Sequence, residues 1–274
     1  MTTRVTQAEL CRRFAKLHEA DGAFIIPNPW DAGTARLLQG MGFAALATTS
    51  GGFALTLAKA DGPPSLEEKL AHCRALVEAV DIPVSADFED GYADTSEGVA
   101  DNTTRLIATG VAGCSIEDYS RTRHSLFEKS EAVDRLAAAA EVVAALDFPF
   151  VLTGRAENLI RGVDDLNDTI ERLVAYEAAG ARVLYAPGLR TLDQVRAVTE
   201  AVTAPVNVLG VLIPGATQKL LADAGAARIS IGGALTYAAM KPVLAFGDHM
   251  ITDGDFSWAE AMASGTRIAE LMDG

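Results

Sequence analysis

The chain has 274 residues, of which 49% are hydrophobic and 22% charged, and its formal net charge is −14. This length suits one large domain or two small ones, and the apolar half of the composition excludes global disorder. Because a strongly negative field repels polyanions, we expect neither nucleic acid nor membrane as a partner.

The cysteines and the N-terminus bear on the compartment. Cys11, Cys73 and Cys114 are widely scattered and form no CxxC pair, so neither a disulfide framework nor a zinc site is indicated. The first 15 residues contain no apolar leader, and the longest uncharged run, 37–58, is too polar for a membrane span. These features predict a cytoplasmic protein.

One local pattern recurs along the chain. A helical segment ends at a glycine, which suits a left-handed C-terminal cap, and a short apolar run follows at once. Such runs are typical of parallel strands that are covered on both faces. The four copies lie in 37–49, 106–118, 174–187 and 220–233, and four further strands are predicted in 23–27, 82–88, 148–155 and 204–209.

Helical stretches separate most of these strands, as in 66–80, 95–109, 131–146 and 165–179. Eight alternations of strand and helix predict an α/β fold, a (β/α)8 TIM-type barrel. A doubly wound open sheet is the alternative, although the first strand is not followed by the GxGxxG turn that would support it.

A tail without strand character follows the eighth strand. We expect residues 1–240 to form the barrel and 241–274 a C-terminal helical extension of the same domain. The tail is expected to be irregular over Lys241–Asp255 and helical afterwards. There, apolar or small residues spaced by four, three, four and three form one stripe, which packs either on its own barrel or on a second subunit. The stripe consists of Trp258, Met262, Gly265, Ala269 and Met272.

Two carboxylates are expected at the working end of the barrel, where parallel strands finish. Asp87 and Glu117 each stand at the tip of a predicted strand. Carboxylates that converge repel one another unless a cation joins them, and hard oxygen ligands favour Mg²⁺, with Mn²⁺ as a substitute. The alternative is that these acids cap the following helices.

Two further features at strand ends suit an anionic ligand. Ser50-Gly51-Gly52 could present backbone N–H groups to a carboxylate or an oxyanion, although Gly-Gly after a strand is also a common turn. Arg155 closes an apolar run and would meet an anion, either a substrate carboxylate or a structural partner such as Glu117 or Glu157.

Several segments of the chain, in their order and spacing, resemble the isocitrate lyase/phosphoenolpyruvate mutase superfamily. Its members are Mg²⁺ enzymes that make or break C–C or P–C bonds in 2-oxo acid chemistry. The resemblance extends over most of the chain. It rests on NPWDAGTARLL, TTSGG, VSADFEDGYAD, GVAGCSIEDYS, LTGRAE, EAAGARVLYAPG and APVNVLG.

The resemblance implies three acidic residues in or near a metal site. Asp87 matches an acid that faces the metal, and Glu117 matches one that serves the metal, often through water. Asp61 matches a further acid near the metal and joins the expected catalytic residues.

The resemblance also implies ligand-binding residues. Ser50 and Gly51, with Gly52 beside them, match the backbone that holds the carboxylate and oxygen of a 2-oxo acid. Arg155 matches an arginine near the substrate and is expected to act in catalysis as well. Asn207 matches a polar residue of the seventh strand.

The chain departs from the superfamily pattern at several places. Ser85 replaces the first acid of D-A-D, and Glu89 is the candidate to restore the missing charge at the metal. The loop that carries a catalytic cysteine in the true lyases reads DYSRTRH here, which leaves His124 as the candidate proton donor. Pro187 stands where the lyases have a glutamate.

We therefore expect a Mg²⁺-dependent carbon–carbon lyase that acts through the enolate of a 2-oxo acid, as in isocitrate or 2-methylisocitrate lyase. Its substrate would be a small 2-oxo or 2-hydroxy di- or tricarboxylate. The alternatives are an oxaloacetate decarboxylase, a phosphonopyruvate mutase or hydrolase, and a 2-oxo acid binding protein without turnover. The resemblance also implies a homotetramer, built from two dimers that exchange the eighth barrel helix.

Overall fold

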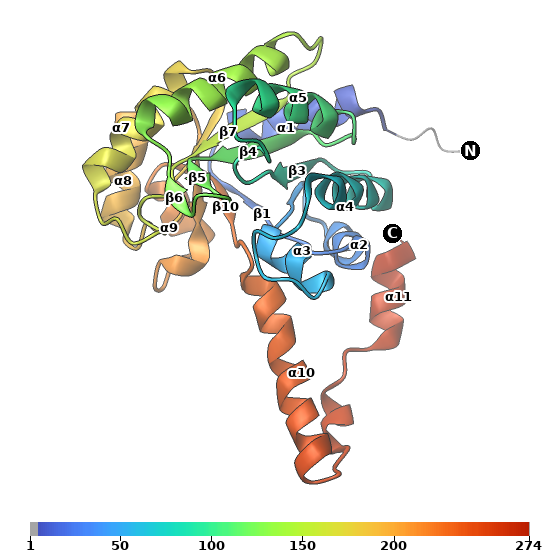
Figure 1. The fold of residues 1–274 in the computed structure, drawn as a ribbon. Coiled ribbons are helices and arrows are strands. Elements are labelled where there is room, and N and C mark those ends of the chain that lie inside the picture. The colour runs from blue at the N-terminus through green and yellow to red at the C-terminus, as the bar shows by residue number, and fades with distance from the viewer. Residues whose placement is uncertain (1–4, 274) are drawn as a thin grey trace.

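The computed structural model describes residues 5–273. Eight parallel strands form one sheet in the order β1-β10-β9-β8-β7-β4-β3-β2. The Ala47 amide donates to the Pro27 carbonyl at 3.0 Å and so links the two outer strands. The sheet therefore closes on itself, and helices surround it (Figure 1). The predicted (β/α)8 barrel is confirmed, and the open-sheet alternative is not.

All eight predicted strands are present but shorter than their apolar runs. β7, for example, begins at Val151 and not at residue 148, because Pro149 has no N–H to donate to a neighbour. The barrel strands are β1 (Phe24–Ile26), β2 (Leu46–Ala47), β3 (Val84–Asp87), β4 (Gly113–Glu117), β7 (Val151–Arg155), β8 (Val183–Tyr185), β9 (Val206–Leu209) and β10 (Ala226–Ser230). A separate antiparallel hairpin consists of β5 (Tyr119–Ser120) and β6 (Ser125–Leu126).

Side-chain caps determine where most of the helices begin. Asp31 and Ser65, for example, form capping boxes. None of the described helices is long and apolar enough to cross a membrane. The helices are α1 (Gln7–Glu19), α2 (Ala32–Gly40), α3 (Ser50–Thr56), α4 (Leu66–Ala79), α5 (Ser96–Ile107), α6 (Lys129–Ala144), α7 (Leu166–Ala178), α8 (Leu192–Ala201), α9 (Gln218–Asp223), α10 (Ala234–Thr252) and α11 (Gly265–Asp273), with 3₁₀ turns η1 (Gly210–Leu212) and η2 (Ser257–Ala261).

The glycines of the recurring pattern do end helices in the left-handed region. Gly42, Gly110, Gly180 and Gly225 have φ angles of 95°, 94°, 102° and 93°. A residue with a Cβ is strained at such angles, so glycine allows the chain to leave each helix and enter the next strand within a few residues. This part of the sequence prediction is confirmed.

Helix α1 closes the end of the barrel where the strands begin. The rings of Phe14 and His18 meet the ring of Phe24, the first residue of β1, in edge-to-face contacts. A Cβ on Gly113, the first residue of β4, would lie 2.9 Å from the Phe14 ring. Helix α1 therefore closes this end of any cavity inside the barrel, and a ligand enters from the opposite end.

The C-terminal tail differs from its prediction. Residues 241–252, expected to be irregular, belong to helix α10, which begins at Ala234 and contains Pro242. The expected domain boundary at 240/241 thus falls inside a helix. The predicted single stripe from Trp258 to Met272 is divided between η2 and α11, because residues 262–264 leave the helical path.

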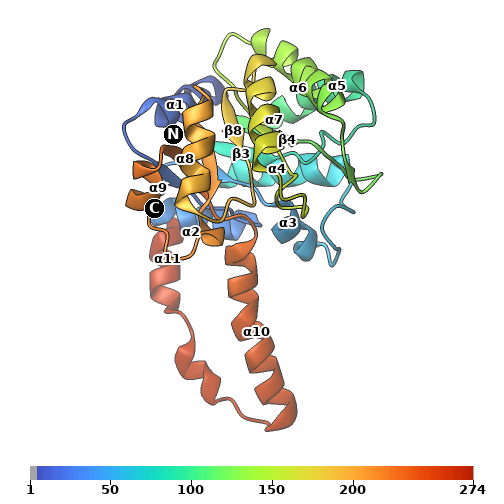
Figure 2. The same ribbon diagram turned by 90° about the vertical axis from the view of Figure 1, so that its left-hand side faces the viewer.

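Helices α10 and α11 form an arm that projects from the barrel and returns to it, as two views show (Figures 1 and 2). The end of α11 packs against α2 of the same chain, where Arg36 Nε donates to the Met272 carbonyl at 2.9 Å. A Cβ on Gly40 would lie 2.1 Å from the Leu271 carbonyl oxygen, so this contact requires glycine.

Two buried histidines make the stability of the fold sensitive to acid. Burial, assisted by the nearby cations Arg228 and Lys69, lowers the pKa of His18 and of His72 from 6.5 to about 3. Below about pH 6.5 the unfolded chain therefore binds more protons than the folded one. The free energy of unfolding should fall with decreasing pH, by up to about 1.4 kcal/mol per pH unit for each histidine.

Urea unfolding between pH 7 and pH 5 checks this expectation. His18→Gln should reduce the pH slope relative to the native protein, whereas His249→Gln, at an exposed position, should leave it unchanged. Equal slopes for His18→Gln and the native chain would contradict the assignment.

Candidate active site

The mouth of the barrel is organised around Arg155, the last residue of β7. Its Nη1 lies 3.2 Å from a carboxylate oxygen of Asp87, at the end of β3, and 3.2 Å from one of Glu117, at the end of β4. Register pairs Glu117 with Arg155 and Asp87 with Ser115 on adjacent strands. The predicted convergence of the two acids is therefore present, and one guanidinium nitrogen bridges them.

A third carboxylate, Glu157, holds Arg155 from the other side. Arg155 Nε donates to Glu157 Oε1 at 2.6 Å, and Arg161 Nε donates to Glu157 Oε2 at 2.8 Å. Glu157 is completely buried, and its backbone N–H donates to Asp118 at 2.7 Å. The alternative of structural ion pairs for Arg155, with Glu117 or Glu157, is thus realised with both acids.

The surroundings of Asp87 and Glu117 shift their pKa values in opposite directions. Burial works to raise the pKa of Asp87, but Arg155 and Lys69 outweigh it and hold this pKa below its usual value. Burial raises the pKa of Glu117 well above its usual value, although Arg155 opposes the shift, and Glu157 adds to it. Asp87 is consequently the acid that remains charged most readily and the stronger candidate for a cation.

Ser50-Gly51-Gly52 is not a loop but the first turn of helix α3, which Thr49 caps. The Ser50 amide donates to Asp87 Oδ2 at 3.0 Å, so it already has an acceptor, and Gly51 carries the next N–H of the turn. A Cβ on Gly51 would lie 3.4 Å from an oxygen of Asp61, which places that acid beside the turn.

A buried lysine, Lys69, is linked to Asp87 through a threonine hydroxyl group. Lys69, on α4, is fully buried and donates from Nζ to Thr48 Oγ1 at 3.0 Å. The same Thr48 oxygen accepts the backbone N–H of Asp87 at 2.9 Å. The hydroxyl group thereby links a buried cation to the strand end that carries the acid.

The segment that replaces the cysteine loop of the true lyases is tied to the rim by Arg121. Its Nε lies 2.7 Å from Glu89 Oε2, its guanidinium covers the Tyr92 ring at 4.0 Å, and it donates to the carbonyls of Gly62 and Pro64. Burial raises the pKa of Glu89 to about 7, and Arg121 opposes the shift. Glu89 thus faces Arg121 and Tyr92.

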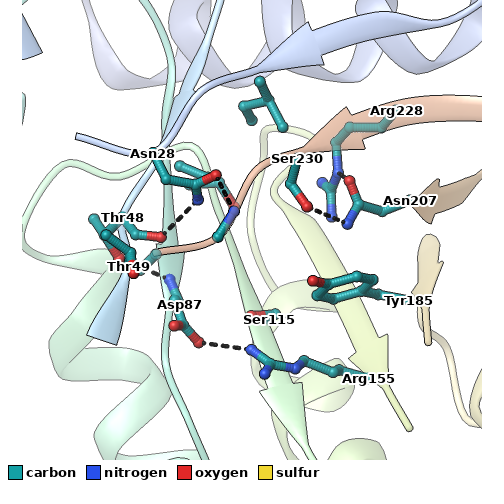
Figure 3. A pocket seen from close by; sticks show the side chains of 15 residues that line it. Asn28, Thr48, Thr49, Asp87, Ser115, Arg155, Tyr185, Asn207, Arg228 and Ser230 are labelled. Atoms are coloured by element: carbon teal, nitrogen blue, oxygen red, sulfur yellow. Dashed lines mark hydrogen bonds and ion pairs between the residues drawn. The ribbon is translucent and has the colours of Figure 1, made fainter. Parts of the chain in front are cut away.

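Two neighbouring hollows lie at this end of the barrel, with Arg155 on the wall of both. The outer hollow, of about 140 Å³, includes Asp61, Glu117 and the exposed His124. The inner one, of about 60 Å³, descends into the barrel and includes Asp87 and Asn207 (Figure 3). Every predicted site residue except Gly52, which is buried behind the turn, therefore lines one of these hollows or stands beside it.

The donors at the mouth suit a divalent cation with few protein ligands. Within residues 5–273 no three acidic, histidine or cysteine side chains form a ready metal cluster. Mg²⁺, however, takes only one or two carboxylates and completes its shell with water and ligand oxygens. Asp87 and Glu117 direct oxygens to one point, the position of Arg155 Nη1, so their chemistry fits such an ion.

Fold and site together define a (β/α)8 protein with acids and an arginine at its mouth, and comparisons with known proteins give its family. Phosphoenolpyruvate phosphomutase is the family that matches, over residues 14–250. The chain is 30% identical to an oxaloacetate decarboxylase of Rhodopseudomonas palustris (strain BisB5), over 89% of this chain and 84% of that one.

It is also 31% identical to an uncharacterized protein of Mycobacterium tuberculosis, over 88% of this chain and 90% of the relative. A crystal structure from Burkholderia cenocepacia J2315, provisionally described as a lyase/mutase, has a TM-score of 0.93 at 45% identity and covers 98% of this chain and 97% of its own. The chain therefore belongs to the phosphoenolpyruvate phosphomutase family, within the isocitrate lyase/phosphoenolpyruvate mutase superfamily. Its relatives with named reactions include lyases and mutases of oxo acids.

Sequence reasoning missed several charged residues of this region. Lys69 lies on a helix and Arg121 in a loop, and neither position carries a strand-end signal. Arg228 had a detectable signal, because it is a charge inside the otherwise apolar strand run AARISIGG. It lies on the wall of the inner hollow.

Proposed function

We propose that this protein is a Mg²⁺-dependent carbon–carbon lyase that acts on a 2-oxo or 2-hydroxy di- or tricarboxylate. The observation that supports this most directly is the pair of carboxylates, Asp87 and Glu117, that meet at one point beside the first turn of α3. Mg²⁺ and Mn²⁺ are both compatible with these oxygen donors.

Asp87 would hold the metal, with Glu117 nearby, either directly or through water. When bound, Mg²⁺ supplies positive charge that polarises the keto group of a 2-oxo acid. The protein adds the Gly51 amide, which lies in a helix first turn, where N–H groups have no intrahelical acceptor. Negative charge that develops on the keto oxygen as the bond breaks would be stabilised by this donor.

Proton transfer would fall to groups that line the outer hollow. His124 is exposed there, and its imidazole group is the kind of side chain that most often transfers protons in enzymes. Asp61, beside Gly51, is the neighbouring acid. Arg155 would orient a carboxylate of the ligand, while Glu157 keeps its guanidinium in place from behind.

Oxaloacetate decarboxylation is the second candidate. It is supported by the absence of a cysteine from the rim segment 118–127, which in the true lyases supplies an acid or base. Loss of carbon dioxide from a 2-oxo dicarboxylate requires no base to deprotonate a hydroxyl group. This reaction therefore makes smaller demands on the outer hollow than cleavage of a 2-hydroxy tricarboxylate.

A panel assay separates these reactions. The protein with Mg²⁺ is incubated with 2-methylisocitrate, isocitrate, oxaloacetate or phosphonopyruvate, and pyruvate or glyoxylate is measured together with succinate, carbon dioxide or phosphate. We expect succinate from one of the two tricarboxylates. Carbon dioxide from oxaloacetate alone would favour the decarboxylase. Phosphate from phosphonopyruvate would favour a hydrolase, and phosphoenolpyruvate, measured in the same mixture, would favour a mutase. Tight oxalate binding without any product would contradict an enzyme and favour a binding protein.

The metal assignment makes a separate prediction. Asp87→Ala should weaken Mn²⁺ binding, measured by calorimetry, by roughly 100-fold or more, because loss of a charged ligand exceeds the 10–100-fold effect typical of outer-shell groups. Asp193→Ala, at an exposed position of α8, is the control. Unchanged Mn²⁺ affinity in a folded Asp87→Ala protein would refute the site.

We also propose a homotetramer of two dimers that exchange their arms. The arm exposes large apolar side chains far from the barrel: Ile251 is 88% exposed and Leu244 70% exposed. Trp258 stacks on Phe246 with ring centroids 5.1 Å apart, which stiffens the tip. Exposed apolar area of this kind is typical of a protein–protein interface.

Light scattering of the intact protein at micromolar concentration should show a tetramer. The pair Leu244→Glu and Ile251→Glu should shift it to smaller species, because charges would enter the interface, and truncation after Asp253 should do the same. A monomeric intact protein would contradict the assembly, whereas a truncated chain that remains tetrameric would refute only the role of the residues after Asp253.

A further inference from the structure

The interior of this barrel is unusually polar and open below its mouth. The interiors of such barrels are ordinarily filled by large branched side chains. Here the inner hollow has small residues on one wall, which leave a space of about 60 Å³ (Figure 3). Its polar and small lining includes Ala47, Ser85, Ser115, Tyr185, Arg228 and Ser230.

Arg228 is a buried charge on the wall of this hollow. It lies in the middle of β10 and is 5% exposed. Its guanidinium crosses the barrel to β7, where Nη2 donates to Thr153 Oγ1 at 3.2 Å, and Nε donates to Asn207 Oδ1 at 2.9 Å. Its Nη1 lies 3.3 Å from His18 Nε2, on the helix that floors the barrel.

All of these partners are neutral groups. His18 is uncharged at neutral pH, because burial lowers its pKa to about 3. Burial also lowers the pKa of Arg228 to about 10, which still leaves the guanidinium charged. None of the ion pairs within residues 5–273 includes Arg228, whereas Arg155 has three carboxylates. A buried charge without a counter-charge is costly, so this position favours an anion.

Tyr185 connects this charge with the mouth. The Arg155 guanidinium lies over the Tyr185 ring at 5.2 Å from its centroid, and the Tyr185 hydroxyl bonds to Ser230. The Ser230 hydroxyl in turn accepts from Asn207, whose other amide atom holds Arg228. A ligand that passes along this ring would reach from the acids of the mouth to Arg228.

We propose that the inner hollow is a subsite for a carboxylate of the ligand, with Arg228 as its counter-charge. The inference rests on the proposed function and requires that its ligand carry at least two carboxylates, one at the mouth and the other inside the barrel. The space suits a carboxylate, because a single water requires 10–15 Å³ of such volume and about four would fit. Because Ser85 stands where the superfamily has an acid, Asp87 is the one acidic side chain among the described residues on the wall of the inner hollow, and Asp87 is paired with Arg155.

A purely structural role for Arg228 makes a different prediction. If Arg228 only links β7, β9, β10 and α1, it contributes to folding alone. Its loss would then weaken the binding of all ligands equally or of none. A subsite requires that its loss weaken only ligands that carry the second carboxylate.

The test compares L-malate with L-lactate, which share a 2-hydroxy acid group and differ in the distal carboxylate. Calorimetry with Mg²⁺ should give at least tenfold tighter binding of malate to the native protein. Arg228→Met should bring the two affinities within about twofold by weakening malate alone, and Arg228→Lys should retain part of the difference. Arg196→Met, an exposed arginine of α8, should behave like the native chain.

Ser115→Asp provides a second variant that leaves Arg228 and its partners in place. The added carboxylate on the wall of the hollow should abolish the preference for malate. If a folded Arg228→Met protein still prefers malate to lactate, the subsite is overturned while the proposed function stands. If Arg228→Met does not fold, the same preference in Ser115→Asp decides in the same way. Binding of neither acid to the native protein would overturn the proposed function as well. If chloride stabilises the protein against unfolding as much as malate does, and Arg228→Met loses this effect, the hollow binds an inorganic anion and the carboxylate subsite is overturned.

Discussion

The ion pairs of Arg155 are the interaction on which the mouth of this barrel depends. Asp87, Glu117 and Glu157 come from different strand ends, and in a buried setting three carboxylates would repel one another strongly without a shared cation. The guanidinium is therefore part of the fold as much as of the site. In the proposed complex, a metal ion held by Asp87 and Glu117 would replace the guanidinium as their counter-charge and free it for a ligand, so cation and anion binding at this mouth would be coupled.

Much of the fold was predictable because its signals are local. A glycine that ends a helix, followed by a buried strand, is a feature of a dozen consecutive residues, and it located strands β2, β4, β8 and β10. The arm was not predictable in this way. The sequence indicated an irregular stretch over 241–255, yet α10 continues through Pro242 to Thr252. The helix projects into solvent, where the carbonyl of the exposed residue Ala238 does not need the missing N–H.

From the residues alone, the site was predictable in its strand-end positions, whereas Asp61, Glu89 and His124 became candidates only through the resemblance to the superfamily. Asp87, Glu117 and Arg155 follow apolar runs, and parallel strands bring their ends together whatever lies between them in the sequence. Lys69 and Arg121 reach the site from a helix and a loop, and their positions depend on packing that no short motif encodes. The first turn of α3 shows the same limit, since the sequence located its amides correctly but not the acceptor that Asp87 supplies to one of them.

The charges inside the barrel are arranged along its axis. Acids surround the mouth, where they meet Arg155. The inner hollow contains Arg228, whose described partners are all neutral, and Ser85 where the superfamily has an acid. A cation at the mouth and a guanidinium within would attract opposite ends of one dianion, and a monoanion would satisfy only one of them. Because the hollow has room for little more than a carboxylate, the same arrangement that attracts the ligand also limits its length.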